Sequence, residues 1–79
     1  MKELTLYDVP IGSKSIIKKV ASNDNIKRRL LDIGLTPGTM VEAVLKNPGG
    51  NLVAYRIRGA LIAIRDDDAK NILIRGLYE

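Results

Sequence analysis

The sequence predicts a mainly β fold: a small barrel of about five strands, SH3-like or OB-like, with one inserted α-helix and a short helical turn before the last strand. Three observations predict it. Turn signals rich in Gly and Pro divide the 79 residues at short intervals. The segments between them alternate apolar and polar residues, apart from one with helical spacing. A chain this short cannot cover an open sheet with helices, and closing the sheet removes its exposed edges. We therefore expect one domain spanning residues 1–79.

The first clear strand is predicted over residues 13–20. The segment before it, residues 4–9, ends in a turn at residues 10–12, where Pro and Gly stand two positions apart. Within the strand, apolar residues stand among lysines, which is typical of a half-exposed strand. These apolar residues are Ile16, Ile17 and Val20.

An α-helix of two to three turns is predicted after residues 23–25. The Asn and Asp side chains there can accept hydrogen bonds from the free amides of a first helical turn. Apolar residues then recur at the i, i+4, i+7 spacing of one helix face, and the basic triplet Lys27–Arg29 lies between them. The apolar residues are Ile26, Leu30 and Ile33. Gly34 follows at once and can adopt the left-handed conformation that ends a helix.

A hairpin is predicted in the middle of the chain. Pro37 and Gly38 form a turn, in which Pro fixes φ and Gly supplies a positive φ. Residues 40–46 and 52–58 then alternate, and the turn at residues 47–50 joins them. The residues expected on the buried face are Val41, Ala43 and Leu45 in the first strand and Val53, Tyr55 and Ile57 in the second. Arg56 and Arg58 are expected on the opposite face.

The C-terminal third predicts two further strands around a helical turn. Gly59 ends the preceding strand, and residues 61–65 form a short apolar strand. Residues 66–71 predict a single helical turn capped by Asp66, with acidic residues in the first turn, where the helix dipole favours them. Residues 72–75 close the fold as the last strand.

The net charge of +4 is concentrated in one segment. Residues 14–29 carry a net charge of +5, and the rest of the chain sums to −1. Such a segment can attract nucleic acid, an anionic membrane surface or an acidic protein patch, or simply form a solvated face. Only three aromatic residues are present, all tyrosines. We therefore do not expect the stacking platform of a single-strand nucleic-acid binder.

The composition leaves little room for catalysis. The chain has no His and no Cys, so it lacks the commonest general base, a thiol nucleophile and two common metal ligands. The three adjacent carboxylates of Asp66–Asp68 do not share one face and lack the spacing of a calcium loop. Gly34 and Gly38 are not followed by the Lys-Ser or Lys-Thr of a phosphate-binding loop. We expect no enzyme activity, no cofactor and no metal site in this chain by itself.

Several segments match one known family in order. Residues 27–39 read KRRLLDIGLTPGT, which resembles a signature of a basic helix start followed by Leu-x-Asp-Leu-Gly-Leu-x-Pro-Gly. Residues 57–65 are similar to its "Gly, two residues, apolar-Ala-apolar-Arg" segment, and residues 68–72 to Glu-Ala-x-x-Ile, with Asp in place of Glu. Leu6, followed by Pro and Gly, matches its first strand and turn. From about residue 4 to 75 the chain resembles ferrous iron transport protein A, the FeoA domain. One departure is the Pro-Ile-Gly turn, because the family more often has Pro next to Gly.

The resemblance implies an SH3-like barrel with an accessory role in bacterial ferrous iron uptake. The implied partner is the large membrane protein of that system, which carries a cytosolic GTP-binding domain. Docking would assemble this transporter or modulate its nucleotide hydrolysis, without this chain handling the iron itself. No apolar run approaches the roughly 20 residues that span a bilayer, and residues 1–4 lack the long apolar stretch of a secretory signal. We expect a cytoplasmic protein that its partner recruits to the inner face of the membrane.

The docking surface is predicted on the basic helix. Its charged contacts are Lys27, Arg28 and Arg29, its apolar anchors are Leu31 and Leu35, and Arg56 and Arg58 would extend it. Leu31 does not share the apolar face of the helix cleanly, so it is either partly exposed or a flank of the core. The two strand arginines either join the surface or solubilise a sheet face. We interpret Gly34, Pro37, Gly38 and Gly59 as structural turn residues.

Three other functions fit parts of the sequence. The basic segment is compatible with a nucleic-acid-binding barrel, although the aromatic platform is missing. A peptide-binding SH3 module would need an aromatic groove for proline-rich ligands. A metal-dependent homodimer is known for related domains fused to metal-sensing repressors, so self-association is a further alternative.

Overall fold

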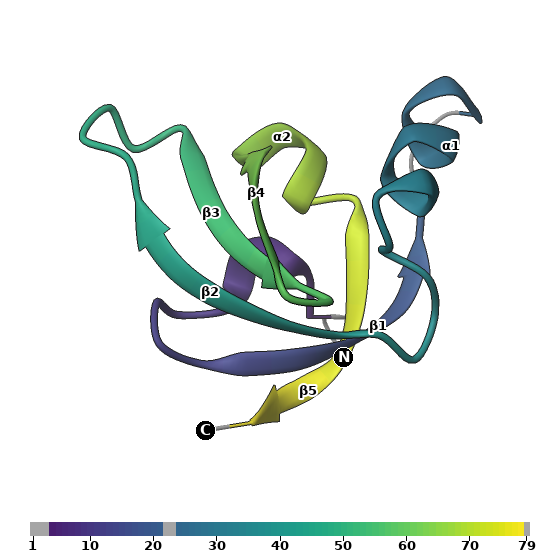
Figure 1. The fold of residues 1–79 in the computed structure, drawn as a ribbon, viewed down its shortest axis with the longest axis horizontal. Helices are drawn as coiled ribbons and strands as arrows, with labels where there is room; N and C mark the ends of the chain where they lie inside the picture. Colours follow the sequence, from purple (N-terminus) through teal and green to yellow (C-terminus); the bar gives the residue numbers. More distant parts are fainter. Residues whose placement is uncertain (1–3, 22–23, 79) are drawn as a thin grey trace.

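The computed structural model describes residues 4–21 and 24–78, and this part of the chain forms five strands with one α-helix and two short helical turns (Figure 1). In chain order they are η1 (Leu6–Asp8), β1 (Lys14–Val20), α1 (Asp24–Asp32), β2 (Met40–Lys46), β3 (Leu52–Ile57), β4 (Ala60–Arg65), α2 (Asp66–Ala69) and β5 (Ile72–Tyr78). The predicted mainly β fold, with one inserted helix and a helical turn before the last strand, is confirmed. The last strand is three residues longer than predicted.

The five strands form one antiparallel sheet in the order β4-β3-β2-β1-β5. Tight turns join β2 to β3 and β3 to β4, whereas β1 lies between β2 and the distant β5. Figure 1 shows the strands bending around a common centre, with α2 lying between β4 and β5. The inward row across three strands runs through Ser15, Val41 and Ile57, which lie opposite one another.

The inner face of the sheet packs into one core. Its buried apolar residues are Leu6, Val9, Ile17, Val20, Leu30, Leu35, Val41, Ala43, Val53, Tyr55, Ile57, Ile64, Ala69, Ile72 and Ile74. The Tyr55 hydroxyl donates a hydrogen bond to the Leu6 carbonyl oxygen at 3.3 Å, and the buried Ser15 hydroxyl donates to the Gly76 carbonyl oxygen at 2.7 Å. Two buried hydroxyl groups therefore gain acceptors inside the core, as burial of polar groups requires.

The end of α1 confirms the role predicted for Gly34. The Leu35 amide donates to the Leu30 carbonyl at 3.0 Å, and the Gly34 amide donates to the Leu31 carbonyl at 3.1 Å. These two bonds and the φ of +108° at Gly34 form a Schellman motif, which satisfies carbonyl groups left free at the helix end. Asn23, one of the predicted cap residues, lies outside the described residues.

The turn at residues 36–38 also forms as predicted. The Thr39 amide donates to the Thr36 carbonyl oxygen at 3.1 Å, and Gly38 has a φ of +91°. With Pro37 before a glycine of positive φ, this is the arrangement of a type II turn. The Gly38 amide donates to the Ile17 carbonyl at 2.8 Å, so the turn is held against β1.

The N-terminal segment differs from the strand that the family resemblance implied. Thr5 forms one isolated bridge with Leu73, and residues 6–8 then form a 3₁₀ turn. The Thr5 amide donates to Asp8 Oδ2 at 2.8 Å, which closes the turn as a capping box. The Thr5 amide is therefore hydrogen-bonded to the Asp8 carboxylate, whereas in a longer strand it would pair with the neighbouring strand.

Two further side-chain positions were predicted wrongly. Leu45 was expected on the buried face, but it is 51% exposed because the register shifts between Ala43 and Leu45. Such a bulge inserts one residue and reverses the alternation beyond it. The predicted cap of α2 is also wrong: Arg65 occupies the N-cap position without a side-chain cap, and Asp66 is the first residue of the helix.

Candidate functional site

The basic triplet lies on α1, which stands at one side of the molecule (Figure 1). Arg28 and Arg29 are exposed and Lys27 is half-buried. Within the described residues none of these three side chains has an ion-pair partner. Their charges are therefore available to an external anionic group.

A cleft of about 590 Å³ separates α1 from the edge strand β4; we call it the α1–β4 cleft. Its apolar lining comes from Ile26 and Leu30 of the helix, from Ile33 in the turn after it, from Leu52 of β3, and from Ile62, Ala63 and Ile64 of β4. Charged residues of both signs surround these apolar groups: Arg29 and Arg65, with Asp67 and Asp68 of α2. Ile33 is 39% exposed, although its helical spacing predicted a core position. The apolar face of α1 is thus only partly covered by the rest of the fold.

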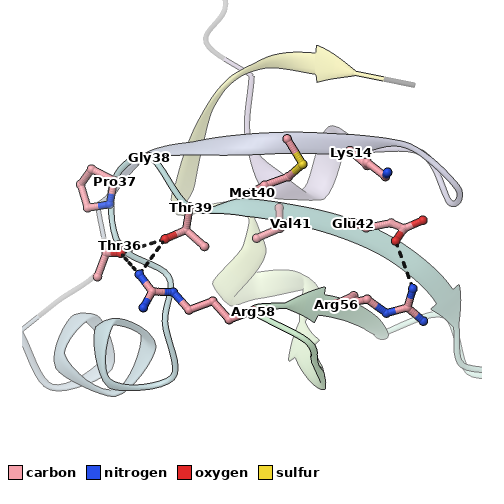
Figure 2. A pocket seen from close by; sticks show the side chains of 10 residues that line it. All are labelled: Lys14, Thr36, Pro37, Gly38, Thr39, Met40, Val41, Glu42, Arg56 and Arg58. Atoms are coloured by element: carbon pink, nitrogen blue, oxygen red, sulfur yellow. Dashed lines mark hydrogen bonds and ion pairs between the residues drawn. The ribbon is translucent and has the colours of Figure 1, made fainter.

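A second concavity of about 610 Å³ lies on the outer face of β1, β2 and β3, beside the turn at residues 36–39; we call it the outer-sheet groove (Figure 2). Lys14 lies opposite Glu42 in the β1–β2 register, and Glu42 lies opposite Arg56 in the β2–β3 register. Arg56 Nη1 pairs with Glu42 Oε1 at 3.4 Å. Lys14 has no ion-pair partner among the residues that the structure describes.

Arg58 occupies one end of the outer-sheet groove. It was predicted to lie in a strand, but it is in the turn between β3 and β4 with a φ of +51°. Its Nη2 donates hydrogen bonds to Thr36 Oγ1 at 3.1 Å and to Thr39 Oγ1 at 3.3 Å. The two threonine hydroxyls are 2.8 Å apart and share a hydrogen bond (Figure 2). The reason for the error is that Arg58 and Gly59 together form the tight hairpin turn, with both φ values positive.

The predicted docking residues separate into three groups. Lys27, Arg28 and Arg29 share α1, whereas Arg56 and Arg58 lie in the outer-sheet groove. Leu31 is partly buried. Leu35 has no exposed surface and belongs to the core, so its assignment as an apolar anchor is wrong. Its Schellman position explains this, because the residue after the C′ glycine commonly packs back onto the helix.

Sequence reasoning missed several residues of these surfaces. Lys14 and Met40 lie in the groove with Arg56 and Arg58, and Met40 is 51% exposed. The alternation of residues 40–46 already placed Met40 on the outer face with Glu42. The β4 side of the α1–β4 cleft could not be found this way, since no periodicity reports how a helix lies relative to a strand.

The described residues contain no cluster of three or more His, Cys, Asp or Glu side chains that could hold a metal ion.

Burial, followed by the negative charge of Asp66, raises the pKa of Tyr55 from 10.0 to about 12. Tyr55 lies in the core with its hydroxyl hydrogen-bonded, so this shift reflects packing and not a proton-transfer site. No helix in the described part of the chain is long and apolar enough to cross a membrane.

Comparison with known proteins gives a consistent result. A family model described as the FeoA domain matches residues 4–76. A search of curated proteins found no match. Solved structures of similar fold include an FeoA-like protein from Clostridium acetobutylicum, with 32% sequence identity and a TM-score of 0.87, covering 100% of this chain and 92% of that chain.

Two further structures extend the comparison. FeoA from Stenotrophomonas maltophilia, solved with zinc, has 29% identity and a TM-score of 0.81, over 91% of this chain and 89% of that chain. It is described as a procaryotic SH3 domain protein and a candidate activating factor of bacterial ferrous iron transport. FeoA from Chlorobium tepidum has 24% identity and a TM-score of 0.83, over 95% and 69% of the two chains.

Proposed function

This chain belongs to the FeoA domain family, and we propose that it docks onto the cytosolic part of the ferrous iron transporter that carries a GTP-binding domain. The family is a non-enzymatic accessory domain implicated in ferrous iron transport. Docking at the inner face of the membrane would assemble this transporter or modulate its nucleotide hydrolysis. The FeoA protein described as a candidate activating factor favours a modulating role.

The observation that carries this proposal is the combination of charge and apolar surface on α1. Arg28 and Arg29 are exposed cations, and Arg29 lines the α1–β4 cleft together with Ile33 of the turn that follows the helix. Cations at a rim accelerate the encounter with an acidic partner, whereas an apolar cleft supplies the area that is removed from water on binding. Both the cations and the apolar cleft are therefore found at α1 and the turn that follows it.

The test is a titration of isotope-labelled protein with the purified GTP-binding domain of the matching transporter. We expect amide shifts clustered in α1 and in β4, where the two sides of the cleft meet. A parallel titration with the whole transporter in detergent would detect binding that requires the membrane part of the transporter. Absence of shifts at high micromolar concentration in both titrations would contradict the proposal.

Two other measurements test the nucleic-acid and homodimer alternatives. A nucleic-acid-binding barrel would bind RNA or DNA with sub-micromolar affinity and a steep dependence on salt. A metal-dependent homodimer would change its sedimentation on addition of a divalent metal ion. We expect neither, because no aromatic residue lines either concavity and the described residues lack a metal-ligand cluster.

A further inference from the structure

The outer-sheet groove has the chemistry of a second recognition site, and we infer that it binds an extended acidic segment of a partner protein, with a carboxylate anchored on Arg58. The inference deepens the proposed function, because it assigns the transporter a second, acidic contact away from the α1–β4 cleft.

Arg58 is held in place before any ligand arrives. Its backbone adopts a φ of +51° in the hairpin turn between β3 and β4. Thr36 and Thr39 hold the guanidinium by two hydrogen bonds, and Gly34 leaves room for its aliphatic stem. An exposed arginine ordinarily samples many rotamers, and an arginine fixed in advance loses less entropy on binding.

The donors around Arg58 outnumber the acceptors. Both hydrogens of Nη2 are used by the threonines, so the N–H groups on Nη1 and Nε keep no partner among the described residues. The shared bond between Thr36 and Thr39 uses one hydroxyl hydrogen and leaves the other free to donate. A cluster that presents N–H and O–H groups selects an acceptor of negative charge, such as a carboxylate.

The cations of the groove are spaced so that an extended chain can reach more than one of them. Lys14, Arg56 and Arg58 face one acid, Glu42, which gives the groove a net charge of +2. Lys14 and Arg56 flank Glu42 from neighbouring strands, and strand spacing places them about 10 Å apart. Side chains at i and i+2 of an extended segment lie about 7 Å apart on one face, so alternate acidic residues can reach two of these cations.

The groove floor favours a peptide over a nucleic acid. Met40 is half-exposed between the charged residues, and the exposed Pro37 adds apolar surface. These groups can contact aliphatic side chains, whereas no aromatic ring is present for a base to stack on. We therefore commit to an acidic peptide as the occupant.

The probe is a synthetic, acetylated seven-residue peptide with Glu at alternate positions and Ala between them, titrated into isotope-labelled protein. We expect shifts at residues 14, 36–42 and 56–59. Arg58→Gln should weaken binding by about tenfold or more, because it removes a charge-assisted hydrogen bond. The double variant Thr36→Val/Thr39→Val keeps every charge and should weaken binding by about threefold through loss of positioning. Lys19→Gln changes the net charge equally outside the groove, and it should leave the affinity unchanged.

Two results would overturn the inference. One is an affinity that Arg58→Gln and Lys14→Gln leave unchanged in folded protein, with shifts confined to α1. The other is single-stranded RNA displacing the peptide from the groove at lower concentration than the peptide itself requires. The transporter domain is titrated separately: if it binds through α1 while the peptide does not bind the groove, this inference falls and the proposed function stands. If the peptide binds the groove and the transporter domain does not bind the protein at all, the proposed function falls and the groove remains an acidic-peptide site.

Discussion

Arg58 lies against Gly34: a Cβ atom built on Gly34 would stand 3.2 Å from Arg58 Cδ. Gly34 ends α1, and Arg58 stands in the hairpin turn between β3 and β4. The contact therefore links two candidate surfaces. Gly34 follows the helix that borders the α1–β4 cleft, and Arg58 is the proposed anchor of the outer-sheet groove. Both the backbone conformation and the close approach require glycine at this position.

Gly34→Ala should destabilise the protein by about 2 kcal/mol or more. The φ of +108° is strained for any residue with a Cβ, and the added methyl group would also displace the Arg58 stem. Urea unfolding followed by circular dichroism measures the loss. Gly49→Ala is the matched control, since Gly49 has no positive φ and its Cβ would meet only side-chain atoms at 3.4 Å or more, an ordinary van der Waals distance. Equal stability of the two variants would contradict this account of Gly34.

Leu35→Ala should cost about 2–5 kcal/mol of the free energy of unfolding, whereas Leu45→Ala should cost less than about 1 kcal/mol. Leu35 is fully buried, and its truncation leaves a cavity; Leu45 is half-exposed. The pair is measured by denaturant unfolding. A large loss at Leu45 together with a small loss at Leu35 would mean that the two leucines are assigned to the wrong sides of the molecule.

These leucines also show where sequence reasoning succeeds and where it stops. Periodicity and turn signals gave the bounds of β2 without error and those of β1, β3 and β4 to within one residue. They failed at Leu45, because a bulge is a choice of register that no local pattern records. They failed at Leu35 because a residue beyond the helix end is placed by the Schellman turn and not by helical spacing.

The candidate surfaces were less predictable than the fold. The basic triplet of α1 could be read from the sequence, since exposed charge follows from helical spacing. The outer-sheet groove could not be predicted, because only the pairing of β1, β2 and β3 places Lys14, Glu42 and Arg56 side by side. Arg58 was found as a residue but placed in a strand, and its partners Thr36 and Thr39 come from a turn far along the chain.

Stability should fall as the pH rises from about 10 to about 12. Below pH 10 Tyr55 is neutral in both the folded and the unfolded protein, so its contribution to the free energy of unfolding is fully present. Between these values the unfolded chain loses the phenolic proton, whereas the folded protein retains it up to the raised pKa of about 12. Deprotonation therefore favours unfolding, by up to roughly 3 kcal/mol once the pH passes the folded pKa. Urea unfolding at a series of pH values measures this loss.

Tyr55→Phe separates this effect from other groups that titrate in alkali. Near neutral pH the variant should be less stable by about 1 kcal/mol, because the Leu6 carbonyl loses its buried donor. As the pH rises the difference should shrink and then reverse, since phenylalanine has no proton to lose. A constant difference between the two proteins across this range would remove Tyr55 as the cause.

Charge reversal on α1 should abolish docking without unfolding the protein. Arg28→Glu/Arg29→Glu lowers the net charge from +4 to 0 and places acids where the proposed partner surface is acidic. Both side chains are exposed, so the expected loss of stability is below about 1 kcal/mol. Lys19→Glu/Lys46→Glu makes the same change in net charge elsewhere and should retain binding in the transporter titration. Equal weakening by both double variants would mean that total charge, and not the α1 face, controls association.

Ile33→Asn should weaken binding to the transporter domain by about tenfold while leaving the fold intact. Ile33 exposes 39% of its surface beside the α1–β4 cleft, so a docked partner would remove an apolar side chain from water, which is worth about 1–1.5 kcal/mol. Leu61→Asn is the matched control, because Leu61 is 56% exposed on β4 but does not line the cleft. Ile33 is not part of the buried core, so asparagine at position 33 leaves the core untouched. Binding that falls equally in both variants would place the partner on the outer side of β4, and unchanged binding in Ile33→Asn would exclude the cleft from the docking surface.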